Sequence, residues 1–328
     1  MNVQLAIQSL AFALIAAGLG LWQVGFVRER GLWRTVAVSG ALLSLAVLVV
    51  STVLVLIGIY AIDRVKISFA VALATIAAAA ITSGAGRLRL MPALLLTAAF
   101  AAALPSLISV MVSSHPAIFF GPLASGSAAI GMLAVLGQRG RETRQSNPWI
   151  AAAGVPAFLI GLALLGADTT DAKWPLYFTL VIAAGLIAAA PLAWLLRGRN
   201  PNLLIPAAVA AGLVGTTADT ARPEALACAA AAGALTCLIG ALLNRLKIDD
   251  ATGAASAFVA AGAAWMLVPT QFDLPYLPHL LGNALLLGAA LVICVIAGFL
   301  LALLLQVTIG LRAPKESGEI PPELVKPR

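Results

Sequence analysis

Few side chains in this sequence could carry out chemistry, and those few are scattered. Histidine is the usual proton carrier near neutral pH, and the two present, His115 and His279, each stand beside a proline in a segment that we expect to be a loop. We therefore interpret both as surface residues. The cysteines lie inside apolar stretches without metal-ligand spacing, which favours small core residues: Cys228, Cys237 and Cys294. No nucleophile–base pair, metal-ligand set or cofactor motif is recognisable, so we expect no enzyme, no metal and no cofactor.

Two sets of polar residues remain as candidates for a solute path. The hydroxyls of Ser125, Ser127 and Ser256 could line a small polar channel, or they could bond across helices and to their own backbone. Carboxylates at the outer ends of apolar stretches could form a weakly cation-attracting vestibule, although solvated loop carboxylates are the simpler interpretation: Asp168, Asp171, Asp219 and Asp273. No expected span carries an ionisable group near its centre, where such groups mark ion and proton paths.

The composition places these residues in a membrane. The chain is 62% hydrophobic and 10% charged, and its mean hydropathy is +1.03. Soluble domains carry about 25% charged residues, and apolar runs of about 20 residues are long enough to cross a bilayer as helices. The net charge of +7 comes from residues at span ends rather than from basic blocks, so we expect no nucleic-acid partner. We interpret the first run, 4–26, as a retained span rather than a signal peptide.

We predict an all-α integral membrane protein with eleven transmembrane helices. The expected spans are 4–26, 35–62, 67–86, 91–113, 121–137, 149–167, 174–196, 203–219, 225–243, 251–270 and 281–308. Positive residues concentrate on one side, which the positive-inside rule makes cytoplasmic. The inner set is Arg28, Arg30, Arg34, Arg87, Arg89, Arg139, Arg141, Arg144, Arg197, Arg199, Arg245, Lys247, Arg312, Lys315, Lys326 and Arg328; the outer set is Arg64, Lys66, Lys173 and Arg222. The N-terminus is therefore expected outside and the C-terminus inside.

Short connections predict one membrane domain, residues 1–310, followed by a cytoplasmic tail, residues 311–328. The tail is polar and rich in proline, which favours an extended or weakly ordered segment. Five spans before and five after one short linker permit a five-plus-five inverted repeat.

The turn between the ninth and tenth expected spans is the most distinctive stretch. It reads Lys247, Ile248, Asp249 and Asp250, and it leads into a span that contains Gly253, Gly262 and Trp265. This stretch resembles the tenth span of the ammonium transporter (Amt/Rh) family. Residues 18–28, 74–89, 203–217 and 310–320 resemble further stretches of that family in the same order. The resemblance implies a helical bundle with one pore per subunit, assembled as a homotrimer.

The family's two pore histidines are missing. By the resemblance, the fifth-span histidine falls on Pro122, four residues before Gly126, and the tenth-span histidine falls on Phe258. Neither side chain can bind or relay a proton. The family's outer aspartate falls near Ser114. Its pore-gating phenylalanines fall near Ala72 and Pro175, and two neighbours, Phe69 and Phe178, could partly substitute for them.

Two functions follow from this comparison. The first is a non-conducting accessory, scaffold or regulatory subunit in the cytoplasmic (inner) membrane. The alternative is a channel or transporter that passes ammonia or another small neutral solute without a histidine relay. Expected partners are membrane lipids, further copies of the chain or a larger membrane complex, and a cytoplasmic regulator at the tail. Pro321 and Pro322 interrupt the family's tail pattern, which leaves such docking open.

Overall fold

A computed structural model describes most of the chain from residue 117 to residue 310. The described residues are 117–136, 148–166, 174–197, 204–217, 223–248, 250, 252–268 and 277–310, together with Leu10, Ala11, Leu14, Ala17, Gly18, Leu21 and Trp22. The expectations for the second to fourth spans, for the tail and for Phe69, Ala72 and Asp249 lie outside these residues.

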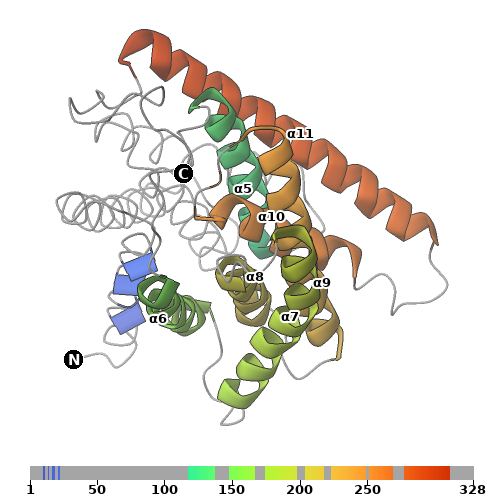
Figure 1. Cartoon of the computed structure of the whole chain (residues 1–328). Helices are drawn as coiled ribbons and strands as arrows, with labels where there is room; N and C mark the ends of the chain where they lie inside the picture. The colour runs from blue at the N-terminus through green and yellow to red at the C-terminus, as the bar shows by residue number, and fades with distance from the viewer. Residues whose placement is uncertain are drawn as a thin grey trace, which may run out of the picture.

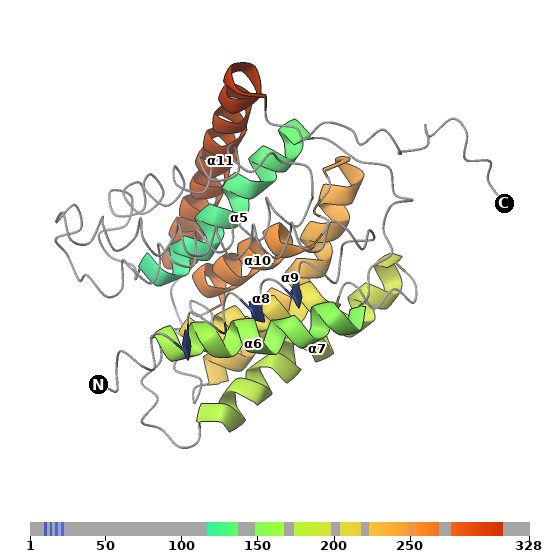
Figure 2. The same cartoon turned by 90° about the vertical axis from the view of Figure 1, so that its left-hand side faces the viewer.

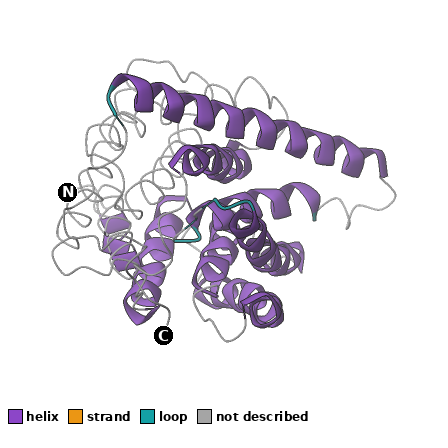
Figure 3. Ribbon diagram, turned by 45° about the horizontal axis from the view of Figure 1, so that its top comes forward, coloured by secondary structure: helices purple, strands orange, loops and turns teal. Residues whose placement is uncertain are grey.

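Every regular element in the described part is an α-helix (Figure 3). The helices are α5 (Ala117–Leu136), α6 (Pro148–Gly166), α7 (Trp174–Arg197), α8 (Leu204–Thr217), α9 (Pro223–Arg245), α10 (Ala254–Leu267) and α11 (Leu277–Thr308). Each overlaps one expected span, from the fifth to the eleventh. Helices α5 and α11 begin earlier than the expected 121 and 281, and α11 therefore includes His279, which the sequence analysis expected in a loop. The runs of apolar residues therefore predicted these helices correctly.

Helix α10 is shorter than the expected span 251–270 at both of its ends. It begins at Ala254 because Gly253 adopts a left-handed conformation with φ 72°, which interrupts the helix. At the other end Val268 still donates to the carbonyl of Ala264 over 2.9 Å. The next residue, Pro269, has no N–H to continue the series.

The helices differ in how they relate to a bilayer. Segments Pro175–Leu196, Pro223–Arg245 and Leu280–Thr308 are long and apolar enough to cross a membrane. In contrast, α8 and α10 have 14 residues each, or roughly 21 Å at 1.5 Å per residue, which is shorter than a hydrocarbon core of about 30 Å. They are also the most buried helices of the described part.

The short helix α10 lies at the centre of the described bundle. It packs against α5, α8, α9 and α11, while α7, α8 and α9 pack against one another and α6 packs against α8 (Figures 1 and 2). The long helix α11 runs obliquely along α5 (Figure 1). The arrangement leaves one face of α7 and one of α11 exposed, and both carry large apolar side chains.

Small residues let these helices approach closely. Along α11, Ala290, Cys294, Gly298 and Ala302 recur every four residues and are buried. A Cβ on Gly298 would meet the carbonyl oxygen of Ala128 in α5. Close backbone contact through such stripes is the usual means of helix association in membranes.

Candidate functional site

The two positions expected to replace the pore histidines lie on helices that cross. Pro122 is in α5 and Phe258 is in α10, and both are buried. The crossing is made by their neighbours. A Cβ on Gly126 would lie 2.8 Å from the nitrogen of Val259, and one on Gly262 would lie 2.9 Å from the nitrogen of Leu123. Such distances are shorter than real Cβ contacts, so α5 and α10 touch backbone to backbone there.

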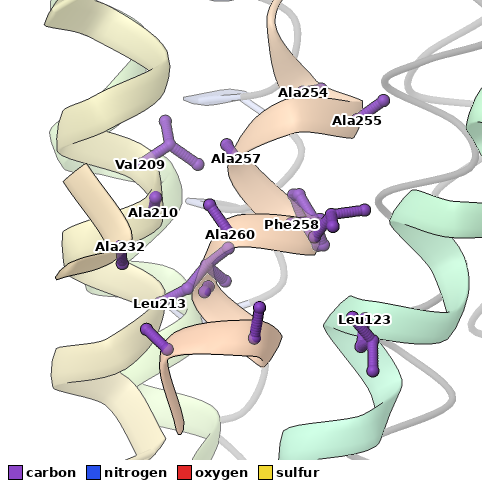
Figure 4. Close-up of a cluster of buried hydrophobic side chains, with 14 of the residues drawn as sticks. Leu123, Val209, Ala210, Leu213, Ala232, Ala254, Ala255, Ala257, Phe258 and Ala260 are labelled. Atoms are coloured by element: carbon purple, nitrogen blue, oxygen red, sulfur yellow. The ribbon is translucent and has the colours of Figure 1, made fainter. Parts of the chain in front are cut away.

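Phe258 fills space at this crossing. Its exposed fraction is 0%, and it belongs to the same apolar cluster as Leu123. Figure 4 shows its side chain on the side of α10 that faces Leu123 of α5, away from Val209 and Ala210 of α8. A ring in this position is in contact with protein over its whole surface.

The crossing of α5 and α10 is reciprocal. Gly126 of α5 faces Val259 of α10, and Gly262 of α10 faces Leu123 of α5. In each helix the glycine lies three positions after the apolar residue. The distance along the chain from Gly126 to Gly262 equals that from Leu123 to Val259. Pro122 and Phe258 are separated by the same number of residues, so they occupy equivalent positions on the two helices.

A second reciprocal contact has the same separation along the chain. A Cβ on Gly18 would meet the nitrogen of Phe158 in α6, and one on Gly154 of α6 would lie 2.5 Å from the nitrogen of Trp22. The rings of Trp22 and Phe158 lie 6.0 Å apart between centroids. Each partner makes the contact that the other makes, which is the property of an interface with twofold symmetry.

The three serines are buried, and each hydroxyl has an intramolecular acceptor. Ser125 Oγ donates to the carbonyl of Pro122 over 3.0 Å, and Ser127 Oγ donates to the carbonyl of Leu123 over 2.6 Å. Ser256 Oγ donates to Oδ2 of Asp250 over 2.7 Å. Their exposed fractions are 2% or less. The hydrogen bonds of Ser125 and Ser127 to their own helix match one of the two interpretations offered by the sequence.

Phe178 lies on α7 and is 7% exposed. Its ring packs against Gly215 of α8, where a Cβ would lie 2.9 Å from Phe178 Cδ2. This contact joins α7 to α8, and the ring belongs to the same buried apolar cluster as Leu123 and Phe258.

The turn before α10 begins with the end of α9. Lys247 has φ 58°, a left-handed conformation that is unusual for a residue with a side chain. Ile248 N donates to Leu243 O over 2.9 Å, and Lys247 N donates to Asn244 O over 3.2 Å. This pair of bonds is the Schellman ending of a helix. Ile248 then packs against the core cluster, which fixes the direction in which the chain leaves α9.

Asp250 supplies the cap that α10 needs at its first turn. The residue at the N-cap position, Gly253, has no side chain to offer. In its place Asp250 Oδ2 accepts from Ser256 N over 2.8 Å, and Oδ1 accepts from Ala255 N over 3.3 Å. Thr252 Oγ1 accepts from Ala254 N over 3.3 Å. The first three N–H groups of α10, which no helical carbonyl can reach, therefore all have acceptors.

Sequence reasoning placed Asp250 in the turn before the tenth span and Ser256 among the residues that could line a polar channel, and it missed that the two side chains bond to each other. The usual sequence signal did not reveal the cap, because that signal is a capping side chain on the N-cap residue itself, and here the N-cap is Gly253.

The described side chains at the α5–α10 crossing are apolar residues and buried serines. Around the α5–α10 crossing the described polar side chains are hydroxyls that bond to backbone or to Asp250. Within the described residues there is also no group of three or more histidine, cysteine, aspartate and glutamate side chains that could hold a metal ion.

Comparisons with known proteins fit this architecture. No protein-family model matches the chain. A protein of Synechocystis sp. (strain ATCC 27184 / PCC 6803 / Kazusa) named "Putative ammonium transporter" is 41% identical over 100 residues, which are 28% of this chain and 23% of that protein. The matched stretch is thus less than a quarter of the relative's length.

Solved structures agree along nearly the whole chain. A structure described as "Sensor Amt Protein" has a TM-score of 0.72 and 18% identity, and the match covers 95% of this chain and 94% of that chain. Rh50 of Nitrosomonas europaea, from the Rhesus protein family of channels, has a TM-score of 0.67 and 16% identity, with 98% and 95% covered. With its apolar helices, the chain is an integral membrane protein that has the fold shared by ammonium transporters and Rhesus proteins.

Proposed function

We propose that the chain is a divergent member of the Amt/Rh family that serves as a non-conducting accessory, scaffold or regulatory subunit. The observation that carries this proposal is Phe258, which is 0% exposed and packed at the crossing of α10 with α5. Its counterpart Pro122 is buried on α5. These are the two positions at which the family resemblance expects histidines.

The physical argument concerns the cost of a cation in the pore. A bare ammonium ion in a low-dielectric passage costs tens of kcal/mol by Born estimates unless it is coordinated or loses its proton. Imidazole can accept and pass on that proton. Phenylalanine and proline side chains cannot, and the buried ring of Phe258 also occupies volume. Both effects oppose conduction of ammonium.

Several finer features belong to the same proposal. The reciprocal contacts at Gly126 and Gly262 and at Gly18 and Gly154 support a five-plus-five inverted repeat. The distribution of Arg and Lys supports eleven spans in a cytoplasmic membrane, with the N-terminus outside and the C-terminus inside. A homotrimer, or a place in a larger membrane complex, and a regulator at the tail follow from the family resemblance alone.

A regulatory role gains support from one of the structural relatives. The structure named "Sensor Amt Protein" matches 95% of this chain, so the fold occurs in a protein described as a sensor. In this chain a pore that does not conduct would leave the scaffold free for such a role.

The direct test is a flux measurement on the full chain in proteoliposomes. An internal pH dye and labelled methylamine and urea would report uptake, with protein-free vesicles as background and a conducting ammonium transporter as positive control. We expect uptake equal to that of protein-free vesicles. Uptake above that background would refute the non-conducting role and favour the alternative, a channel for ammonia or another small neutral solute.

Two variants separate the outcomes. If uptake is seen, its loss in Ser127→Leu would locate the path beside α5. If none is seen, the double variant Pro122→His, Phe258→His tests whether the fold retains a latent path. Phe258→Leu, which keeps an apolar side chain and no proton acceptor, is the matched control for the second comparison.

A further inference from the structure

The first turn of α10 contains an unusual cap, and Phe258 lies directly beyond it. Asp250 is outside the helix, yet its carboxylate accepts from two backbone N–H groups and from the hydroxyl of Ser256. The shortest of these bonds are 2.7 and 2.8 Å, both to Ser256. Charge-assisted bonds of this kind are about twice as strong as neutral ones.

The turn that carries Asp250 is itself held in place. Ile248 packs into the core cluster, and Gly253 lies against the ring of Pro206 in α8, where a Cβ would come within 2.6 Å of Pro206 Cγ. Gly253 N also donates to the carbonyl of Asp250 over 3.2 Å. The carboxylate is therefore fixed relative to α8 and α9 and not only to α10.

These contacts give the first turn of α10 one defined position. Ser256 is two residues before Phe258, and Ala257 N closes the first helical bond to Gly253 O over 3.0 Å. If the cap were lost, the N–H groups of Ala255 and Ser256 would lose the acceptors that they have in the interior. The first turn would then fray, and Phe258 would lose the backbone that holds it at α5.

We infer that Asp250 is a positioning residue for Phe258, whose buried ring is the closure of the pore in the proposed function. The carboxylate of Asp250 accepts from Ala255 N, Ser256 N and Ser256 Oγ and so keeps the first turn of α10 helical. The ring of Phe258 therefore stays packed against α5. This inference rests on the proposed function, because it concerns the same closure. It adds the residue outside the pore that maintains it.

The test is thiol accessibility beside Phe258, measured on the full chain with Phe258 intact. Val259→Cys provides the reporter, since Val259 is 4% exposed and cysteine is smaller than valine. In this form Cys228, Cys237 and Cys294 are replaced by alanine. A second form keeps only the native Cys237, which is 0% exposed on α9 and packs towards Ala189 of α7. The reagent is a small, charged methanethiosulfonate.

We expect both thiols to react slowly when Asp250 is present. Asp250→Ala should raise the rate at position 259 about tenfold, the size expected when a helix loses its cap and opens locally, and should leave Cys237 within about twofold. Asp250→Asn keeps one acceptor oxygen and should give an intermediate rate. Ser256→Ala removes only the hydroxyl bond and should give the smallest increase.

Two results would overturn the inference. One is an unchanged rate at position 259 in Asp250→Ala. The other is an equal rise at both thiols, because this would mean that the carboxylate stabilises the whole bundle rather than the first turn of α10. Uptake assays on the unsubstituted chain test the proposed function separately, because solute flux in that chain would refute it. The relative labelling rates of the Asp250 and Ser256 variants test only the role of Asp250.

Discussion

Gly262 offers a quantitative test of the crossing between α5 and α10. In Gly262→Ala the new Cβ would lie 2.6 Å from Leu123 Cβ, 2.9 Å from Leu123 N and 3.0 Å from Leu123 Cα. Ordinary contacts of this kind begin at 3.4 Å. None of the three atoms is the end of a flexible side chain, so the two backbones must move apart. Overpacking of this kind costs about 1–3 kcal/mol.

The same substitution has a matched control on α11. Around Gly288 nothing lies within 4 Å of an added Cβ, so Gly288→Ala should be neutral or stabilising by up to about 1 kcal/mol, because alanine favours the helix over glycine. Apparent melting temperatures in detergent, followed by circular dichroism and size-exclusion chromatography, measure both. We expect a lower melting temperature for Gly262→Ala and an unchanged or higher one for Gly288→Ala.

A double substitution refines this test. Leu123→Ala keeps the Cβ, the nitrogen and the Cα that an alanine at position 262 would meet. It should therefore fail to rescue Gly262→Ala, even though it shortens the side chain. A full rescue by Leu123→Ala, or a melting temperature for Gly262→Ala equal to that of Gly288→Ala, would refute the backbone contact between the two helices.

Three further predictions concern other described contacts. Lys247→Gly should stabilise the protein by about 0.5–1 kcal/mol, since φ 58° is strained for lysine and not for glycine; Leu246→Gly, one residue earlier, should destabilise it, and the melting temperatures compare the two. Asn283→Leu should cost about 1 kcal/mol, because Asn283 Nδ2 donates to Met266 O at the end of α10 over 3.0 Å; a melting temperature unchanged from the parent would contradict this. Ser127→Ala should change stability by less than about 1 kcal/mol and leave solute uptake unchanged, because its hydroxyl bonds to its own helix.

The sequence predicted the number and order of the described helices well, because long apolar runs in a membrane chain have few other solutions. It predicted the ends of α10 less well. Hydrophobicity gives no sharp boundary there, because the residues next to the helix, Ala251 to Gly253 before it and Val268 and Pro269 after it, are small or apolar and carry no charge. The start depends on the φ of Gly253 and on the carboxylate of Asp250, and both act through local geometry that composition does not report.

That Pro122 and Phe258 stand where the family has its pore histidines stays a prediction. Resemblance to a family placed Pro122 and Phe258, and the structure brings their helices together. The sequence left two interpretations for Ser125, Ser127 and Ser256. Only coordinates show which acceptor each hydroxyl meets, and for Ser256 the acceptor is Asp250. The reciprocity of Gly126 and Gly262 was also invisible, because no long identical repeat marks it in the chain.

The shortness of α10 has a consequence for how the protein responds to its lipids. Its first turn is satisfied by Asp250 and Thr252, a carbonyl at its far end is taken by Asn283, and nearly all of its residues are buried. The hydrogen bonds at both ends of α10 are thus made within the chain, and little of the helix surface is in contact with lipid or water. The outer face of α11 is built of exposed leucine, isoleucine, valine and phenylalanine. A thicker or thinner bilayer should therefore change the tilt of α11 while the geometry of α10 stays the same.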